Sequence, residues 1–399
     1  MDFEDTAEEA AFRLEARTWL KAHAREKEPG EVSTLRGFYD SDDLFVEQGR
    51  AWQRTLYEGG WAGIQWPVAY GGRGGTSMQQ LIFRQEEARF DVPSGLFAVG
   101  IGMAGPTIIA HGTDAQRTRY LPAMLRGDDV WCQLFSEPGA GSDLASLTTR
   151  ADADGDQWVV NGQKVWSSGA HHAQYGILLA RTNWDAPKHK GITFFLVDMA
   201  TPGIEVRPLR QMTGGSSFNE VFLSDVRIPA ENVVGAVNEG WRVTMTTLGH
   251  ERSMSGGGSP FAQLVRLVRH QGALGDPVLR DLLVQCYVRG RLLEFLGYRA
   301  QTRLSRGEEP GPESSVMKLA FSQLNTLMAR VAIDAQGPTG MLVGEGTPDH
   351  GTWQQQFLSA PSFRIAAGTD EVQRNVLGER VLGLPAEPRV DKDAPFRSR

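Results

Sequence analysis

Apolar residues recur at helical spacing through the first third of the chain. Two stripes with three- and four-residue spacing predict helices there: Phe3, Ala7, Ala10, Ala11 and Leu14, and then Met78, Leu81, Ile82 and Ala88. A third helix is predicted to open at Thr113, whose side chain can cap a helix N-terminus, and to end at Gly127. Together these patterns predict a helical domain over residues 1–129.

The hydrophobic pattern changes near Val130 to short runs that are rich in β-branched and aromatic residues. Such runs predict strands, and they cover residues 131–135, 175–180, 192–197 and 220–229. Asn161-Gly162 lies between two further short runs, and this dipeptide predicts a hairpin turn because it suits the tightest turns between antiparallel strands. Residues 130–234 are therefore predicted to form a β domain.

Helical spacing returns after Gly235. Helices are predicted over residues 237–255, 277–305, 312–335 and 369–381. Residues 385–399 are rich in proline and charge and offer little to bury, so we expect this tail to be loose. A C-terminal helical domain is thus predicted over residues 235–399, and the chain as a whole belongs to the α+β class.

The composition narrows the function classes. The chain has 399 residues, of which 41% are hydrophobic and 22% charged, and its formal net charge is −7. A mildly acidic surface argues against nucleic acid and anionic membranes as main partners. No stretch approaches the roughly eighteen apolar residues of a membrane span. The acidic N-terminus also lacks the basic start of a secretory signal. We therefore expect a cytoplasmic protein without a membrane span.

Cysteine and histidine residues offer no metal constellation. Cys132 and Cys286 are the only cysteines, and without CxxC spacing they are expected to be reduced, packed thiols. His171 and His172 are adjacent, so on a strand they would point to opposite faces and could not share a metal. We expect both to be polar surface residues, and we predict no metal site.

Residues 131–143 carry the strongest candidate site. An apolar strand at 131–135 runs into a turn that contains Pro138 and two glycines, with Ser136 and Ser142 on either side. A strand that ends in such a loop exposes backbone N–H groups, which together with small hydroxyls suit a flat heterocycle. The alternative is an ordinary Gly/Pro turn. The glycine cluster at 71–75 lacks the GxGxxG spacing of a dinucleotide site and is predicted to be a loop.

Four groups of motifs, in order along the chain, resemble the acyl-CoA dehydrogenase family. They are Phe-Ser-Glu-Pro-Gly-Ala-Gly-Ser-Asp at 135–143, Asn-Gly-Gln-Lys-Val-Trp-Ser-Ser-Gly at 161–169, Asn-Glu-Val-Phe-Leu-Ser-Asp-Val-Arg-Ile-Pro at 219–229, and Gly-Thr-Asp-Glu-Val-Gln-Arg-Asn at 368–375 with Glu-Arg-Val-Leu-Gly-Leu-Pro at 379–385. The resemblance covers essentially the whole chain. The sequence pattern is similar to that of actinobacterial-type members. It implies an N-terminal helical domain, a β-barrel-like middle domain, a C-terminal four-helix bundle and a place in fatty-acid or lipid metabolism.

The resemblance also implies FAD, held between the β domain and the helical domains. The residues that it implies for cofactor binding are Gln133, Leu134, Phe135, Ser136, Gly141, Ser142, Trp166, Ser168, Thr369 and Glu371. Trp166 and Ser168 would lie on the far side of the isoalloxazine. A helix that begins near Thr369 would meet the ribityl or phosphate region, since its free N–H groups favour anions. Outside the motif, Trp166 would be expected to be a core aromatic of a hairpin.

The reaction implied by the resemblance is α,β-dehydrogenation of an acyl-CoA thioester. A carboxylate removes the α proton while the β hydrogen leaves as hydride to flavin N5. Many members carry this glutamate just before the Gly-Thr of the C-terminal loop, where this chain has Ala367. A second family position lies in a Leu-x-x-Glu-Arg pattern, which residues 248–252 match. We therefore assign the base to Glu251. The alternative is a solvated helix glutamate that pairs with an arginine.

The resemblance implies three positions around the thioester. Arg252 is expected near the flavin or the bound thioester, and Ser142 is expected to line it. The backbone N–H of Ala367 survives the loss of the carboxylate and would donate a hydrogen bond to the thioester oxygen. The glycine run at 256–258, together with Ala366 and Ala367, predicts room for a bulky or branched acyl chain.

Departures from the family pattern concern the oligomer. Homotetrameric members carry Arg-x-x-Phe-Gly and Gln-x-x-Gly-Gly-x-Gly segments, where this chain has Ser-Gly-Gly-Gly-Ser-Pro-Phe at 255–261 and Asp-Ala-Gln-Gly-Pro-Thr-Gly at 334–340. The carboxylate of Asp334 would be unfavourable near a diphosphate. The sequence leaves open a homo- or hetero-oligomer, either dimer or tetramer.

Three functions compete at this point. The first is a dehydrogenase that takes an acyl-CoA substrate and passes electrons to an electron-transfer flavoprotein. The second is an oxidase or flavin monooxygenase of the same fold. The third is a catalytically silent partner subunit that completes the FAD site of another chain. The candidate base Glu251 and the intact loop at 135–143 favour the first.

Overall fold

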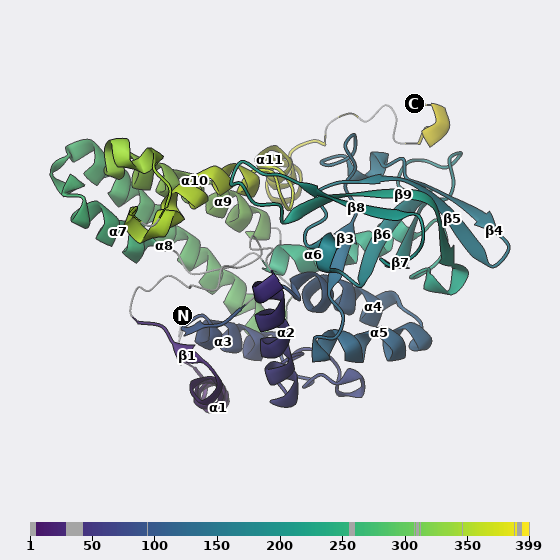
Figure 1. The fold of residues 1–399 in the computed structure, drawn as a ribbon, viewed down its shortest axis with the longest axis horizontal. Helices are drawn as coiled ribbons and strands as arrows, with labels where there is room; N and C mark the ends of the chain where they lie inside the picture. The colour runs from purple at the N-terminus through teal and green to yellow at the C-terminus, as the bar shows by residue number, and fades with distance from the viewer. Residues whose placement is uncertain are drawn as a thin grey trace. The chain divides into compact units, whose positions relative to one another are not determined.

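The computed structural model describes residues 5–28, 43–93, 95–254, 260–306, 308, 311, 313–344, 346–386, 388 and 393–398. Helices precede the main sheet and helices follow it (Figure 1), which confirms the predicted order of helical, β and helical regions. The chain divides into two compact units. One contains Met1–Thr34, Ser77–Asp91 and Ser255–Ala386, and the other contains Leu35–Thr76, Val92–Met254 and Glu387–Arg399.

In the first unit, α1 (Ala7–His23) packs against α3 (Ser77–Glu87). The short strands β1 (Arg25–Glu26) and β2 (Phe90–Asp91) pair antiparallel. A buried carboxylate, Glu86, joins the two helices, because Arg17 Nε lies 2.8 Å and Arg13 Nη1 3.2 Å from its oxygens. Arg89 Nη1 also lies 3.3 Å from this carboxylate, and the three arginines together compensate for the cost of its burial.

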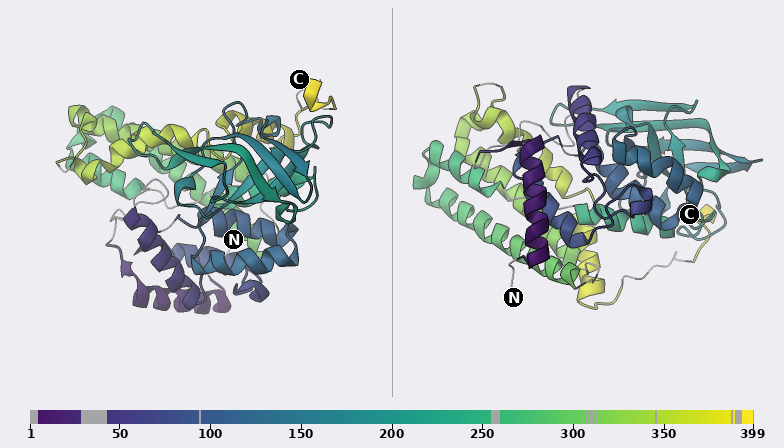
Figure 2. Two further views of the ribbon diagram at one scale, coloured as in Figure 1. Left: turned by 45° about the vertical axis from the view of Figure 1, so that its right-hand side comes forward. Right: turned by 90° about the horizontal axis from the view of Figure 1, so that it is seen from below.

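The same unit contains a bundle of α7 (Phe261–His270), α8 (Pro277–Ser305), α9 (Glu313–Gln336) and α10 (Thr352–Phe363), drawn in shades of green in Figure 2. Cys286, Met328 and Trp353 are buried in its core. α11 (Asp370–Val376) packs against α9 and continues into the π-helical turn η9 (Leu377–Val381). The helices predicted at 277–305 and 312–335 are confirmed. No helix in the described ranges combines the length and apolarity that crossing a membrane requires.

The second unit contains α2 (Asp43–Glu58), α4 (Gly105–His111), α5 (Asp114–Arg126) and α6 (Gly240–Met254). Thr113 caps α5 and Gly127 ends it in a left-handed conformation, as predicted. α4, α5 and α6 lie on one face of the sheet (Figure 1), where Ile108, Leu121 and Val243 share a core with Trp131 and Phe194. The loop predicted at 71–75 is confirmed.

The sheet has seven strands: β3 (Trp131–Leu134), β4 (Arg150–Asp154), β5 (Gln157–Lys164), β6 (Tyr175–Arg181), β7 (Ile192–Asp198), β8 (Ile204–Leu209) and β9 (Phe218–Pro229). The order is β3-β6-β4-β5-β9-β8, and β7 pairs with β6. β6 runs parallel to β3 and β4, whereas the other pairs are antiparallel. Within the described residues this path does not close, so the sheet is open rather than a closed barrel.

The hairpin predicted at Asn161-Gly162 is wrong. β5 runs straight through both residues, with an irregularity of register between Val160 and Gly162. The turn lies instead between the paired residues Asp154 and Gln157, where Gly155 has a φ of 63°. Gly162 allows Thr149 to pack closely against β5, since a Cβ at residue 162 would lie 2.5 Å from Thr149 Oγ1. The Gly-Asp dipeptide at 155–156, which forms the two-residue turn, was the true hairpin signal.

The tail is not loose where the structure describes it, so that expectation is corrected. Phe396 is 8% exposed. Its N–H donates to Ala186 O at 3.0 Å, and the N–H of Arg397 donates to Trp184 O at 2.9 Å. One large aromatic side chain and two backbone hydrogen bonds fix a segment whose average composition predicts no burial.

Candidate functional site

A buried ion pair holds the loop that follows β3, which we call the β3–β4 loop (residues 135–149). Glu137 Oε1 and Lys164 Nζ lie 2.8 Å apart, and their side chains are 6% and 0% exposed. The carboxylate also accepts hydrogen bonds from the N–H and hydroxyl of Thr148 and from the N–H of Thr149. Lys164 Nζ donates a second bond to Phe135 O at 3.0 Å. The pair therefore joins the two ends of the loop to each other and ties them to β5.

Burial alone would raise the pKa of Glu137. The charge of Lys164 and the hydrogen bonds to the carboxylate outweigh that effect and hold the pKa of Glu137 at about 2. For Lys164, burial lowers the pKa of the ammonium group despite its partner.

Acid is expected to weaken the fold through Glu137. Its folded pKa of about 2 lies below the ordinary value of 4.5, so its stabilisation is complete above pH 4.5 and is lost as the pH falls toward 2. Urea unfolding between about pH 6 and pH 3 measures this slope. Glu137→Gln is expected to be less stable at neutral pH and to have a flatter acid limb. Identical slopes for both proteins would contradict this assignment.

The backbone turns outward directly after β5, at Trp166. Its φ is 62°, its side chain is 57% exposed, and it meets Phe218 edge-on with ring centroids 5.8 Å apart. A left-handed conformation costs a non-glycine residue about 1–2 kcal/mol. Reciprocal backbone hydrogen bonds between Ser167 and Asn219, at 3.0 and 3.2 Å, impose it. Trp166 is thus not the core aromatic of a hairpin.

Four backbone N–H groups at this sheet end lack an acceptor among the described residues: those of Gly141, Ser142, Trp166 and Ser168. They belong to two neighbouring loops, which the hydrogen bond from Val165 N–H to Ser136 O joins at 2.9 Å. Free donors, small hydroxyls and an exposed indole together form a suitable border for a planar, hydrogen-bonding heterocycle. These residues fit a flavin.

Other predicted cofactor residues differ in what they present. Leu134 and Phe135 are buried in the core, so only their backbone can border a ligand. Gln133 and Ser136 are half-buried, whereas Gly141 and Ser142 are exposed. If residues 134 and 135 border a cofactor, as the motif predicts, they would do so through main-chain atoms.

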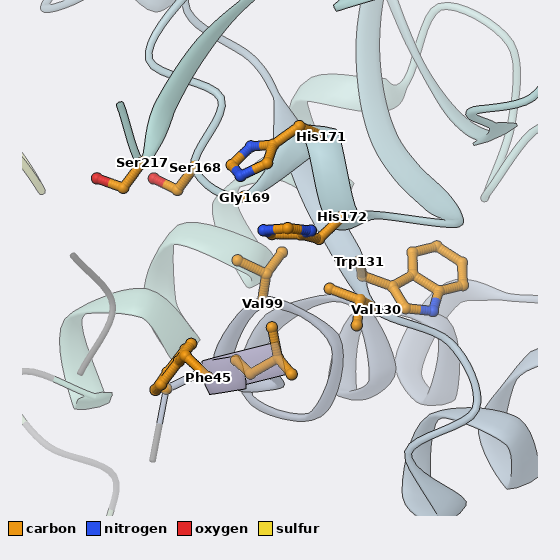
Figure 3. A pocket seen from close by; sticks show the side chains of 11 residues that line it. Phe45, Val99, Val130, Trp131, Ser168, Gly169, His171, His172 and Ser217 are labelled. Atoms are coloured by element: carbon orange, nitrogen blue, oxygen red, sulfur yellow. The ribbon is translucent and has the colours of Figure 1, made fainter. Parts of the chain in front are cut away.

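A small pocket of about 30 Å³, partly open to solvent, adjoins Ser168. Phe45, Leu96, Val99, Val130 and Trp131 supply apolar walls, and His171, His172 and Ser217 lie across from Phe45 and Val99 (Figure 3). The expectation that the two histidines lie on opposite faces of a strand is wrong. They occupy a short 3₁₀ turn, Ala170–His172, and their ring centroids are 3.9 Å apart. His171 Nδ1 lies 2.9 Å from the amide nitrogen of Asn219.

Glu251 lies on the inward face of α6. Val243 and Thr247 precede it at four-residue intervals, so the three share one side of the helix, and the first two are fully buried. Thr247 Oγ1 lies 2.9 Å from Thr107 Oγ1 of α4. Glu251 itself is half-buried. The backbone of Arg252 belongs to the same helix. Its side chain, like the glycine run at 256–258, lies outside the described residues.

The loop before α11 has an unusual backbone. Ala367 and Gly368 have φ values of 53° and 86°, and Thr369 caps the helix by accepting from Val372 N–H. Gln373 Nε2 donates to Ala367 O at 2.9 Å, which anchors the carbonyl. The N–H of Ala367 has no acceptor in the described part of the chain. This N–H belongs to the preceding peptide unit, 366–367, and is available to a ligand.

Ala367→Val is expected to lower the free energy of unfolding by about 1–2 kcal/mol, because a β-branched residue is strained at positive φ. Ala367→Gly, which tolerates this conformation, is expected to be at least as stable as the wild type. Urea unfolding of the three proteins measures both changes. Equal stability of the valine variant would show that the loop relaxes without cost.

Family models for acyl-CoA dehydrogenases match three consecutive segments. The N-terminal domain matches residues 6–128, the middle domain residues 132–226 and the C-terminal domain residues 238–382. The chain belongs to the acyl-CoA dehydrogenase family. It is 39% identical over 386 residues to acyl-CoA dehydrogenase IpdE1 of Mycobacterium tuberculosis, which covers 95% of this chain and 98% of that protein. To FadE34 of the same organism it is 44% identical, over 84% of this chain and 46% of that one.

Solved structures with a similar fold support the same family assignment. The steroid ACAD Tcur3481-Tcur3483 has a TM-score of 0.81 at 29% identity, and the ChsE4-ChsE5 complex of Mycobacterium tuberculosis has 0.79 at 30%. Each alignment covers 97% of this chain and 100% of the other. These matches confirm the predicted fold, the actinobacterial-type resemblance and an oxidoreductase of acyl-CoA dehydrogenation. Proteins of this family are flavoproteins.

Two parts of the site escaped the sequence analysis. One is the π-helical turn η2 (Gly100–Ala104), which packs on β3 and α6. Such turns occur often at functional sites. The glycines at 100 and 105 were its signal, since a Cβ at Gly105 would meet Trp66 at 2.1 Å. The other is the histidine pocket, whose residues come from segments that are distant in sequence.

Proposed function

We propose that this chain binds FAD and catalyses α,β-dehydrogenation of an acyl-CoA, with Glu251 as the base that removes the α proton. The placement of Glu251 on the inward face of α6 carries the proposal. Glu251 lies one turn beyond the buried Thr247 and is half-buried. A partly buried carboxylate at this position can accept a proton from a bound substrate.

The cofactor residues divide by the chemistry that they offer. The free N–H groups of Gly141, Ser142 and Ser168 and the indole of Trp166 would hold the isoalloxazine and its neighbourhood. Thr369 and Glu371 begin α11, whose first turn already contains two carboxylates. Negative charge there favours ribityl hydroxyls over a phosphate. Bound FAD supplies the acceptor for the β hydrogen, which leaves as hydride.

The chain itself moves one proton and stabilises one charge. Glu251 would take the proton from the carbon next to the thioester. The Ala367 N–H would donate to the thioester oxygen as negative charge develops there. Gln373 holds the carbonyl of the same residue, in the next peptide unit. Ser142 and Arg252 would border the thioester, as the family resemblance implies.

The substrate class that we propose is a bulky, ring-bearing acyl-CoA. The pocket beside Ser168 has apolar walls on one side and histidine rings on the other. Apolar walls and ring nitrogens suit an apolar ring system that carries an oxygen function. The similarity to a protein described as a steroid ACAD points the same way.

Partner subunits and an electron acceptor complete the proposal. Val284, Val288, Leu292 and Phe295 form an exposed apolar stripe along α8, which supports assembly into a homo- or hetero-oligomer. A relative of similar fold is described as a complex of two different chains. We propose an electron-transfer flavoprotein as the acceptor. A cytoplasmic location fits the two free, buried cysteines.

Anaerobic titration tests the function. The purified chain is expected to show flavin absorbance, which bleaches with ring-bearing acyl-CoAs more readily than with straight-chain ones. Colourless protein would favour the silent-partner function. Reoxidation by oxygen as fast as by an electron-transfer flavoprotein would favour the oxidase.

A further inference from the structure

A buried arginine connects the C-terminal tail to the β3–β4 loop. Arg181, at the end of β6, is 0% exposed. Its Nη2 donates to Ala145 O at 2.7 Å and its Nε to Leu147 O at 3.1 Å. The guanidinium therefore holds two carbonyl groups of the loop, three and five residues beyond Ser142. A donor fork of fixed geometry restrains both carbonyls at once.

The same guanidinium restrains the segment between β6 and β7. Its Nη1 donates to Lys188 O at 3.2 Å. Lys188 Nζ in turn lies 2.9 and 2.8 Å from the two carboxylate oxygens of Asp143. Asp143 directly follows Ser142, so all three restrained residues lie within five residues on the C-terminal side of the residues with free N–H groups. Arg181 makes the first restraint itself, through Ala145 O and Leu147 O. Lys188, whose carbonyl Arg181 holds, makes the second.

Phe396 covers the guanidinium of Arg181. Its ring lies 3.5 Å from Arg181 Cζ, which is close contact between a guanidinium and an aromatic face. Trp184 packs against the same ring, with centroids 5.4 Å apart. The bridge between Pro187 and Pro395 adds main-chain pairing on the same segment. Without Phe396, water would reach the guanidinium and compete for its donors.

We propose that residues 393–398 act as an intramolecular clamp: through Phe396 and Arg181 they fix the β3–β4 loop in the conformation that binds the cofactor. The proposal rests on the proposed function, because it takes Gly141 and Ser142 as FAD donors. Phe396 is a positioning residue, since it acts through Arg181. The polar composition of the tail does not predict this positioning role.

Four proteins test the clamp: a chain that ends at residue 392, Phe396→Ala, Phe396→Tyr and Arg397→Ala. The tyrosine keeps the aromatic face. Arg397 is the matched control, because it is adjacent and its side chain pairs only with the exposed Asp185. Two quantities are measured. They are the Kd for FAD added to the apoprotein, and the amide hydrogen exchange of residues 141–149 in the absence of FAD.

Truncation and Phe396→Ala are expected to raise the Kd by about tenfold and to speed exchange in the loop. Phe396→Tyr and Arg397→Ala are expected to match the wild type. Unchanged Kd and exchange after truncation would overturn the proposal, and so would an equal effect of Arg397→Ala. If the wild type binds no FAD, the proposed function fails, and the exchange rates alone then decide whether the clamp exists.

Discussion

Glu251→Gln is expected to lower kcat for acyl-CoA dehydrogenation by about 10²–10⁴-fold while FAD remains bound. Glutamine keeps the shape and polarity of the side chain but cannot accept the α proton. The flavin donors lie on other elements, so cofactor content should not change. Stopped-flow bleaching of the flavin under anaerobic conditions measures the step directly, and flavin absorbance at rest measures the content.

Glu239→Gln is the matched control. It makes the same chemical change just before α6, where the glutamate is exposed and pairs with Arg242 at 3.7 Å. Turnover of that variant is expected to equal the wild type. Bleaching by Glu251→Gln at the wild-type rate would remove the base assignment. Loss of bound FAD from the Glu251 variant would indicate a structural role instead.

Lys164→Met is expected to destabilise the protein by about 3–5 kcal/mol, because it leaves the carboxylate of Glu137 buried without its cation. The same change should loosen the β3–β4 loop, since Lys164 also bonds to Phe135 O. Urea unfolding gives the free energy, and flavin content after gel filtration reports the loop. The double variant with Glu137→Gln is expected to recover part of the loss.

Arg207→Met provides a comparison on the same sheet. Its ion pair with Glu205 lies on the surface, and its removal is expected to leave the unfolding midpoint unchanged. If Lys164→Met behaved like Arg207→Met, the buried pair would contribute nothing to folding. The loop would then owe its shape to backbone hydrogen bonds alone.

Capped helices and alternating strands were the predictable part of the fold. Thr113 and Gly127 mark α5 because capping is local chemistry. In β9, Val221, Leu223 and Val226 are buried in the pattern that the sequence shows. These features depend on neighbours within a few residues. They can therefore be predicted from a single amino-acid sequence.

Features set by distant partners were not predictable. Asn161-Gly162 resembles a turn, but the need for Gly162 arises from Thr149, which packs where a Cβ would lie. Phe396 stands in a polar tail, and its burial depends on Arg181, more than two hundred residues earlier. The histidine pocket likewise draws on five separate segments. Candidate residues could be assigned by motif, but their side-chain placement required the fold.

The two buried cysteines can report when the core around each of them unfolds. Burial raises the pKa of Cys132 to about 12 and of Cys286 to about 11, so neither forms appreciable thiolate near neutral pH. Because the thiolate is the reactive species, alkylating reagents should label them only when the core opens. Cys132 lies in the sheet unit and Cys286 in the bundle unit. Their separate labelling rates would therefore time the unfolding of each unit in one intact protein.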